Sequence, residues 1–92
     1  MKIYTITYAS YTKEDNYLYN EVTATTNRVE AINQYEAWKD NARSQAKGED
    51  DEYNIIQKEA SITDRYSKYE VARDVNNSEY YQAVIKLHVI VV

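Results

Sequence analysis

Strict alternation of apolar and polar residues marks the segment 79–92. Its odd positions are apolar from residue 81 onward, and they are Tyr81, Ala83, Ile85, Leu87, Val89 and Val91. The even positions include Gln82, Lys86 and His88. Successive side chains of a β-strand point to opposite faces, so this period of two predicts a strand with one packed face and one face toward water or a partner. A chain with such a strand must build a sheet whose apolar face needs a second layer.

The segment 27–48 predicts that second layer. Asn27 is a favourable helix N-cap, and Glu30, three residues later, fits a capping box. Apolar residues then recur at the helical period along one side, at Ala31, Ile32, Tyr35, Trp38, Ala42 and Ala46. The only glycine, Gly48, follows Lys47, where the end of a helix favours glycine. We therefore expect one amphipathic helix over one face of the sheet.

The remaining segments complete the predicted sheet. Residues 2–9 and 17–25 have strand composition, and the polar stretch 10–16 between them predicts an antiparallel hairpin. The apolar residues of 53–75 fit a strand face and a helical stripe about equally well. We favour a strand at 53–63, another at 66–72, and a turn at 76–78. The predicted fold class is α+β, a single domain of residues 1–92 in the order β-β-α-β-(β)-β, with four to five antiparallel strands and one helix.

The residue types that catalysis and cofactor binding need are scarce. The chain has no cysteine, one glycine and one histidine, which excludes thiolate metal sites and Gly-rich phosphate loops. His88 falls on the wet side of the last predicted strand, and the consecutive acids 49–52 lack the spaced ligands of a calcium loop. We expect no catalytic residue, no metal ligand and no cofactor, hence no enzyme activity.

The charge balance bears on nucleic-acid binding. Eleven Lys and Arg against fifteen Asp and Glu give a net charge of −4, which opposes contact with a phosphate backbone. Basic residues and tyrosines do interleave between 65 and 73, but acids mixed among them cancel the local charge. Direct nucleic-acid binding is therefore only a third hypothesis.

Binding to another protein is the leading hypothesis. Tyrosine occurs eleven times and phenylalanine never, so tyrosines must pack the core, contact partners, or do both. An acidic run followed by an aromatic suits a basic groove on a partner, although a solubilising loop beside a rim tyrosine has the same sequence. Tyr17 and Tyr19 of the first hairpin offer a second contact surface. The predicted partner-binding residues are Glu49, Asp50, Asp51, Glu52, Tyr53, Tyr17 and Tyr19.

A resemblance refines this hypothesis. The join Glu21-Val22-Thr23-Ala24-Thr25-Thr26-Asn27-Arg28-Val29-Glu30-Ala31-Ile32 resembles the strand-to-helix join of many short β-β-α-β proteins encoded by bacteriophages and mobile elements. In size, acidity and architecture the chain resembles some anti-CRISPR proteins, over about residues 2–48. The resemblance implies a protein in the cytoplasm of a bacterial host that binds a host protein, such as a CRISPR-associated effector, and inhibits a nucleic-acid-handling complex. It carries over no functional residue.

Two further expectations concern assembly and location. The long apolar last strand predicts, as the alternative function, a self-associating structural or regulatory domain that forms a homodimer through that strand. The sequence has no apolar run of membrane-spanning or signal-peptide length, so we expect no membrane association.

Overall fold

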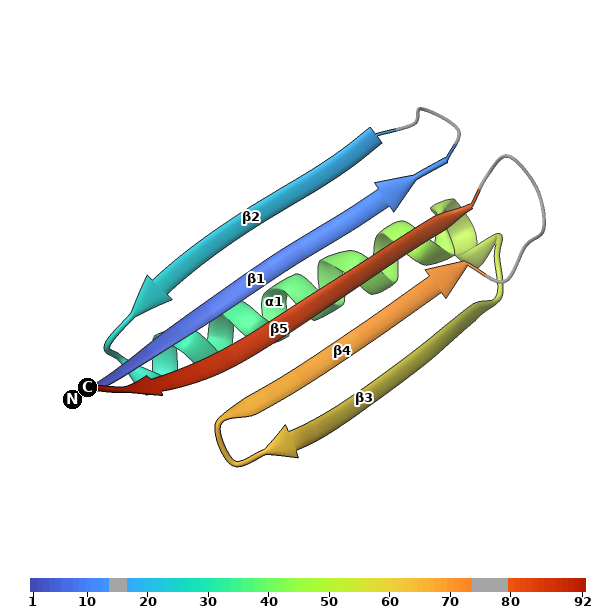
Figure 1. The fold of residues 1–92 in the computed structure, drawn as a ribbon. Helices are drawn as coiled ribbons and strands as arrows, with labels where there is room; N and C mark the ends of the chain where they lie inside the picture. The colour runs from blue at the N-terminus through green and yellow to red at the C-terminus, as the bar shows by residue number, and fades with distance from the viewer. Residues whose placement is uncertain (14–16, 74–79) are drawn as a thin grey trace.

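Figure 1 shows the fold in a computed structural model of the chain, which describes residues 1–13, 17–73 and 80–92. In chain order the elements are β1 (Lys2–Thr12), β2 (Tyr17–Thr25), α1 (Arg28–Lys47), a short 3-10 turn η1 (Glu49–Asp51), β3 (Ile55–Thr63), β4 (Tyr66–Arg73) and β5 (Tyr81–Val91). The predicted α+β fold is confirmed, and the described part of the ambiguous segment 53–75 contains two strands. β1 runs on to Thr12, beyond the predicted end at residue 9. The turn predicted at 76–78 lies outside the described residues.

The five strands form one antiparallel sheet in the order β2-β1-β5-β4-β3, and α1 lies across one face of it (Figure 1). β5 pairs with β1 from Lys2↔Val91 to Thr12↔Tyr81, and with β4 along its other edge. The predicted homodimer through the last strand is therefore wrong, because β5 is central and has no open edge to offer another copy.

The core lies between α1 and the middle of the sheet. Ile6, Val71 and Ile85 are its largest fully buried side chains. Among the residues whose burial the structure describes, five tyrosines are also buried, and they are Tyr4, Tyr8, Tyr35, Tyr69 and Tyr81. These rings supply the aromatic area that phenylalanine would otherwise supply. The hydroxyls of Tyr35 and Tyr69 donate to Glu59 and Gln57, and those of Tyr8 and Tyr81 hydrogen-bond to each other. Much of the tyrosine content is thus explained by packing.

Both ends of α1 follow from local chemistry. The Asn27 side chain accepts a hydrogen bond from the Glu30 backbone N–H at 3.1 Å, as predicted. The Glu30 carboxylate, however, accepts from the Thr25 hydroxyl at 2.9 Å instead of completing the capping box with the Asn27 N–H. At the other end Gly48 has a φ of 74°, and its N–H donates to the Ser44 carbonyl at 3.1 Å. Few other residues adopt this backbone conformation without strain.

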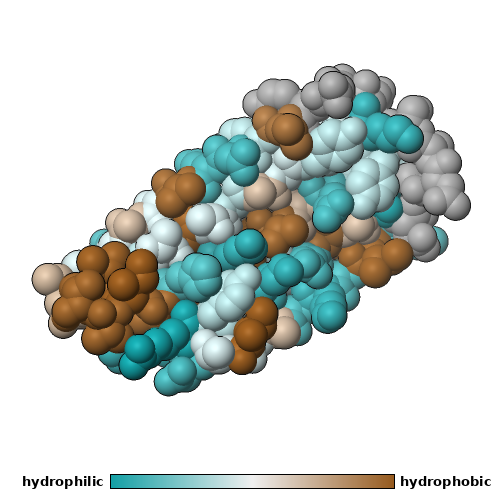
Figure 2. All heavy atoms as spheres, in the orientation of Figure 1, coloured by the Kyte–Doolittle hydropathy of each residue, from teal (hydrophilic) through white to brown (hydrophobic). Residues whose placement is uncertain are grey.

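The sheet face opposite α1, here called the open face, is not covered by another layer. Figure 2 shows apolar side chains scattered over the molecule among polar ones, with the largest apolar group at the end where the two termini lie. The register places four exposed aliphatic side chains on the open face, at Leu18, Val22, Ile56 and Ile90. In the part of the chain that the structure describes, no helix combines the length and apolar character that crossing a membrane requires.

Candidate functional site

The acidic turn, residues Glu49 to Glu52, lies exposed directly after α1. Asp50 and Asp51 both adopt left-handed backbone conformations, with φ of 57° and 54°. Lys47 forms an ion pair with Asp51 at 3.9 Å, whereas Glu49 and Asp50 form none with the described residues. The turn therefore presents negative charge to solvent, as predicted.

Tyr53, predicted as a contact residue, is half-buried and packed. Its ring lies under the Arg73 guanidinium, 4.2 Å from the ring centroid, and against the backbone of Gly48. The same guanidinium donates to the carbonyls of Ala46 and Gln45 at 3.0 and 2.8 Å, so it caps the C-terminus of α1. Tyr53 thus helps to fix the end of the helix, and only part of its ring faces solvent.

Tyr19, in the edge strand β2, faces the α1 side of the sheet. Its ring packs edge-on against Tyr8 at 5.7 Å, and its hydroxyl donates to the Glu21 carboxylate. Its exposed fraction is 37%, which leaves part of the ring open to solvent. The backbone of Tyr17 pairs with Thr12.

The predicted contact residues fall on two separate surfaces. Tyr19 lines a hollow on the β2 side of α1, with Trp38, Asn41 and Gln45 of the helix. The acidic turn borders a second hollow, lined by other helix residues such as Asp40, Arg43 and Lys47. The two hollows have no lining residue in common.

The open face carries a lysine row that sequence reasoning missed. Lys58, Lys68 and Lys86 come from three neighbouring strands, and the register sets Lys68 directly opposite Lys86. Like charges opposite each other on one sheet face are unfavourable, and here Glu70 relieves the repulsion through an ion pair with Lys68 at 2.7 Å. The signal is spread over three strands, so it emerges only when the register is known.

Two further groups on the open face were discussed from sequence. The His88 ring lies 4.2 Å from the Tyr66 ring, centroid to centroid, and His88 is exposed, as expected for the wet side of β5. Tyr69 and Arg73 interleave in the sequence with Tyr66 and Lys68, but both point to the α1 side of the sheet. The basic and aromatic residues of 65–73 are therefore split between the two faces.

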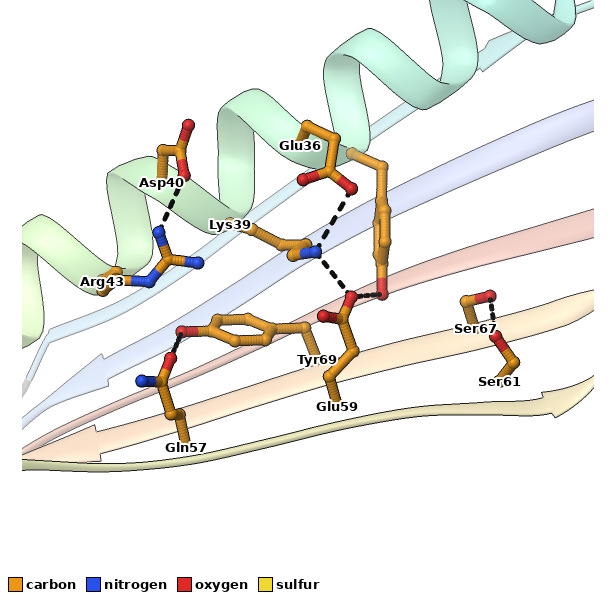
Figure 3. Close-up of polar contacts among 10 residues, drawn as sticks. Glu36, Lys39, Asp40, Arg43, Gln57, Glu59, Ser61, Ser67 and Tyr69 are labelled. Carbon is orange, nitrogen blue, oxygen red and sulfur yellow. Dashed lines mark hydrogen bonds and ion pairs between the residues drawn. The ribbon is translucent and has the colours of Figure 1, made fainter.

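A buried lysine forms the best-connected polar cluster (Figure 3). Lys39 of α1 is only 6% exposed, and its ammonium contacts the carboxylates of Glu36 at 3.2 Å and Glu59 at 2.5 Å. Burial alone would lower the pKa of Lys39, but the hydrogen bonds from both carboxylates outweigh burial and raise it. The Tyr35 hydroxyl also donates to Glu59, and burial followed by this carboxylate raises the pKa of Tyr35. The cluster joins α1 to the edge strand β3, which is a structural task.

Within residues 1–13, 17–73 and 80–92, no group of three acidic, histidine or cysteine side chains is placed so that it could hold a metal ion. The described residues offer three candidate surfaces, namely the open face, the acidic turn and the hollow beside Tyr19. Comparison with known proteins gives no further guide, since no family model, curated protein or solved structure matches the chain.

Proposed function

We propose that the chain is a non-catalytic protein-binding module whose partner docks on the open face of the sheet. The exposed aliphatic side chains of that face carry the proposal. Leu18 is 70% and Val22 64% exposed, although both lie in a regular strand whose other face packs toward α1. Exposed apolar side chains on an uncovered sheet face gain free energy when another protein surface buries them.

The charges of the open face describe the complementary partner. The lysine row Lys58, Lys68 and Lys86 shares the open face with Leu18 and Val22 of β2, and Ile56 lies two residues before Lys58 on the same face of β3. A partner surface that is apolar with a few acidic side chains would match this pattern. Partial pairing of Lys68 with Glu70 lowers its desolvation cost in such an interface.

The acidic turn supports a second contact of opposite charge. Its exposed carboxylates suit a basic groove, as the sequence predicts, and they lie apart from the open face, so substitutions can separate the two contributions. Inhibition of a host nucleic-acid-handling complex, which the resemblance to anti-CRISPR proteins implies, stays a prediction that requires the partner to be identified.

One observation favours a second candidate function, binding of single-stranded nucleic acid. The lysine row and the adjacent, mutually tilted rings of Tyr66 and His88 share the open face, and aromatic rings beside lysines bind single strands in other sheets. Protein binding has the stronger support here, because exposed aliphatic side chains share the face with the row and Glu70 neutralises part of its charge.

Two valines of equal exposure give a matched test. Val22 is on the open face and 64% exposed, whereas Val29 is in the first turn of α1 and 65% exposed. We expect V22E to weaken capture of a partner from host lysate more than tenfold, the size of a hot-spot loss of roughly 1.4 kcal/mol or more, and V29E to leave it unchanged. Equal capture by both variants would refute docking on the open face.

A second pair of measurements separates the other contacts. Replacing Glu49, Asp50, Asp51 and Glu52 together by alanine tests the acidic turn, and unchanged capture at low salt would remove it from the interface. Titration with single-stranded DNA and RNA at two salt concentrations tests the nucleic-acid function, which requires an affinity that falls steeply with salt.

A further inference from the structure

We propose that the hollow between α1 and the β1–β2 hairpin, here called the aromatic hollow, binds the head group of an organic cation such as a methylated ammonium or a guanidinium. The hollow has a volume of about 270 Å³, enough for a small head group. The lining residues that bear on the proposal are Tyr8, Tyr19, Glu21, Trp38, Asn41 and Tyr81. The hollow lies on the α1 side of the sheet, so the proposal is independent of docking on the open face.

Three rings form the aromatic wall. Tyr19 and Trp38 flank Tyr8 with centroid distances of 5.7 and 5.8 Å, and their ring planes make angles of 80° and 78° with the Tyr8 ring. Rings set at right angles to a common neighbour expose π-faces in more than one direction. Sites that hold methylated ammonium groups use aromatic rings in this way, because a weakly hydrated cation is attracted by their negative faces.

The wall also carries one carboxylate. Glu21 accepts a hydrogen bond from the Tyr19 hydroxyl, which holds the negative charge beside the ring. Among the described residues that line the hollow, none is a lysine or an arginine. The charge of the site therefore favours a cation and opposes an anion.

The floor is polar but uncharged. The hydroxyls of Tyr8 and Tyr81 lie 3.0 Å apart, and Asn41 Nδ2 donates to the Tyr8 hydroxyl at 3.4 Å. Burial, together with the hydrogen bond to Tyr8, raises the pKa of Tyr81 further above neutral pH, so the floor carries no charge from this hydroxyl. A floor of this kind accepts a guanidinium N–H or borders methyl groups without demanding a second charge.

The only tryptophan of the chain makes the site directly measurable. Because Trp38 lines the hollow, its fluorescence reports a ligand there. We expect choline to change the Trp38 emission with a saturable dependence on concentration. Dimethylbutanol, the neutral isostere in which carbon replaces the nitrogen, should bind at least about fivefold more weakly, since it lacks the charge that the rings and Glu21 attract. Equal responses to the two compounds, or no response to either, would overturn the proposal.

Two variants and a control test the residues. E21Q and Y19L should each weaken choline binding about fivefold, by removing the carboxylate or one ring. E30Q makes the same charge change at an exposed site in the first turn of α1, away from the hollow, and should leave the affinity unchanged. Because Tyr19 and Glu21 are exposed, both variants should fold, and circular dichroism checks this. Unaltered affinity in E21Q and Y19L would contradict the site.

Two sources could supply such a cation, and peptides distinguish them. A free small molecule predicts that choline binds as tightly as a peptide carrying trimethyl-lysine or arginine. A partner side chain predicts that one of these peptides binds more tightly than choline, with the same dependence on Glu21 and Tyr19. Either result supports cation recognition, and a failure of V22E to disturb partner capture would leave it untouched.

Discussion

Replacement of Lys39 tests whether a buried ion pair holds α1 on the edge of the sheet. The ammonium bridges Glu36 of the helix and Glu59 of β3, while the Nζ atom lies 5.0 Å from the ring centroid of Tyr35 and 5.6 Å from that of Tyr69. Two substitutions separate charge from packing. K39M retains most of the aliphatic stem between the rings, and K39A removes both the charge and the stem.

The expected losses follow from burial. Hydrogen bonds between charged groups contribute about 1.5–3 kcal/mol each, but the side chains of Glu36 and Glu59 are 56% and 47% exposed and regain water once the lysine is gone. We therefore expect K39M to lower the free energy of unfolding by about 1.5 kcal/mol. K39A also loses three buried methylenes at about 0.8 kcal/mol each, for a total of about 3.5–4 kcal/mol.

Urea denaturation followed by circular dichroism measures both losses. Each kcal/mol should lower the melting temperature by about 4–8 °C in a domain of this size. K47A is the control, because its ion pair with Asp51, at 3.9 Å, is exposed and should contribute less than about 0.5 kcal/mol. If K39A and K39M were equally stable, the stem would contribute nothing and the reasoning from packing would be refuted. If both matched K47A, the ion pairs would be irrelevant to stability.

Three further predictions concern stability. Burial raises the pKa of the Tyr35 and Tyr81 hydroxyls, so the unfolded chain loses these protons first, and the free energy of unfolding should fall as the pH rises above about 10; urea titrations across that range with tyrosinate absorbance test this, and a flat profile would contradict it. G48A should destabilise by about 1–2 kcal/mol, because φ is +74° and the added Cβ would lie 3.2 Å from the Tyr53 ring; no loss on calorimetry would show that the backbone relaxes. N27A should cost about 1 kcal/mol through the lost N-cap, and N27D, which can still accept from the Glu30 N–H, should restore most of it in the same assay.

Local sequence signals predicted the helix and the first and last strands of the chain well. Asn27, the apolar stripe and Gly48 are all close together in sequence, so they define α1 without any knowledge of its surroundings. The alternation of 81–91 likewise identified β5 and the face that packs against the helix. Alternation does not predict which strands pair with β5. The central position of β5, and with it the failure of the predicted homodimer, depends on long-range pairing.

The ambiguity of the segment 53–75 has a physical reason in its first half. β3 is an edge strand that α1 barely covers, and its residues are exposed from Ile56 to Thr63. A strand with two wet faces has no burial pattern for the sequence to record. Lys39 illustrates the opposite failure. Lys39 lies on the buried side of α1. The sequence gives no reason to bury a lysine, and the reason appears only when Glu59 of β3 is seen to pair with it.

The candidate sites also differ in whether their residues are adjacent in the sequence or only in the fold. The acidic turn is a contiguous run, so its exposure was predictable from the sequence alone. The aromatic hollow draws residues from β1, β2, α1 and β5, and the lysine row draws on β3, β4 and β5. Neither assembly has a local signature, because each exists only through the strand order and register.

The central β1–β5 ladder also sets the order in which the chain can fold. The hairpin β1–β2 and the meander β3-β4-β5 each form from neighbouring segments, but they join only when β5 pairs with β1 across nearly the whole sequence. Non-local pairing of this kind slows folding, since the entropy of closing the loop is lost before the contacts compensate it. During synthesis the β1 edge that pairs with β5 stays unpaired until β5 has left the ribosome. A chain arrested before residue 81 would therefore expose an edge prone to pairing with other chains.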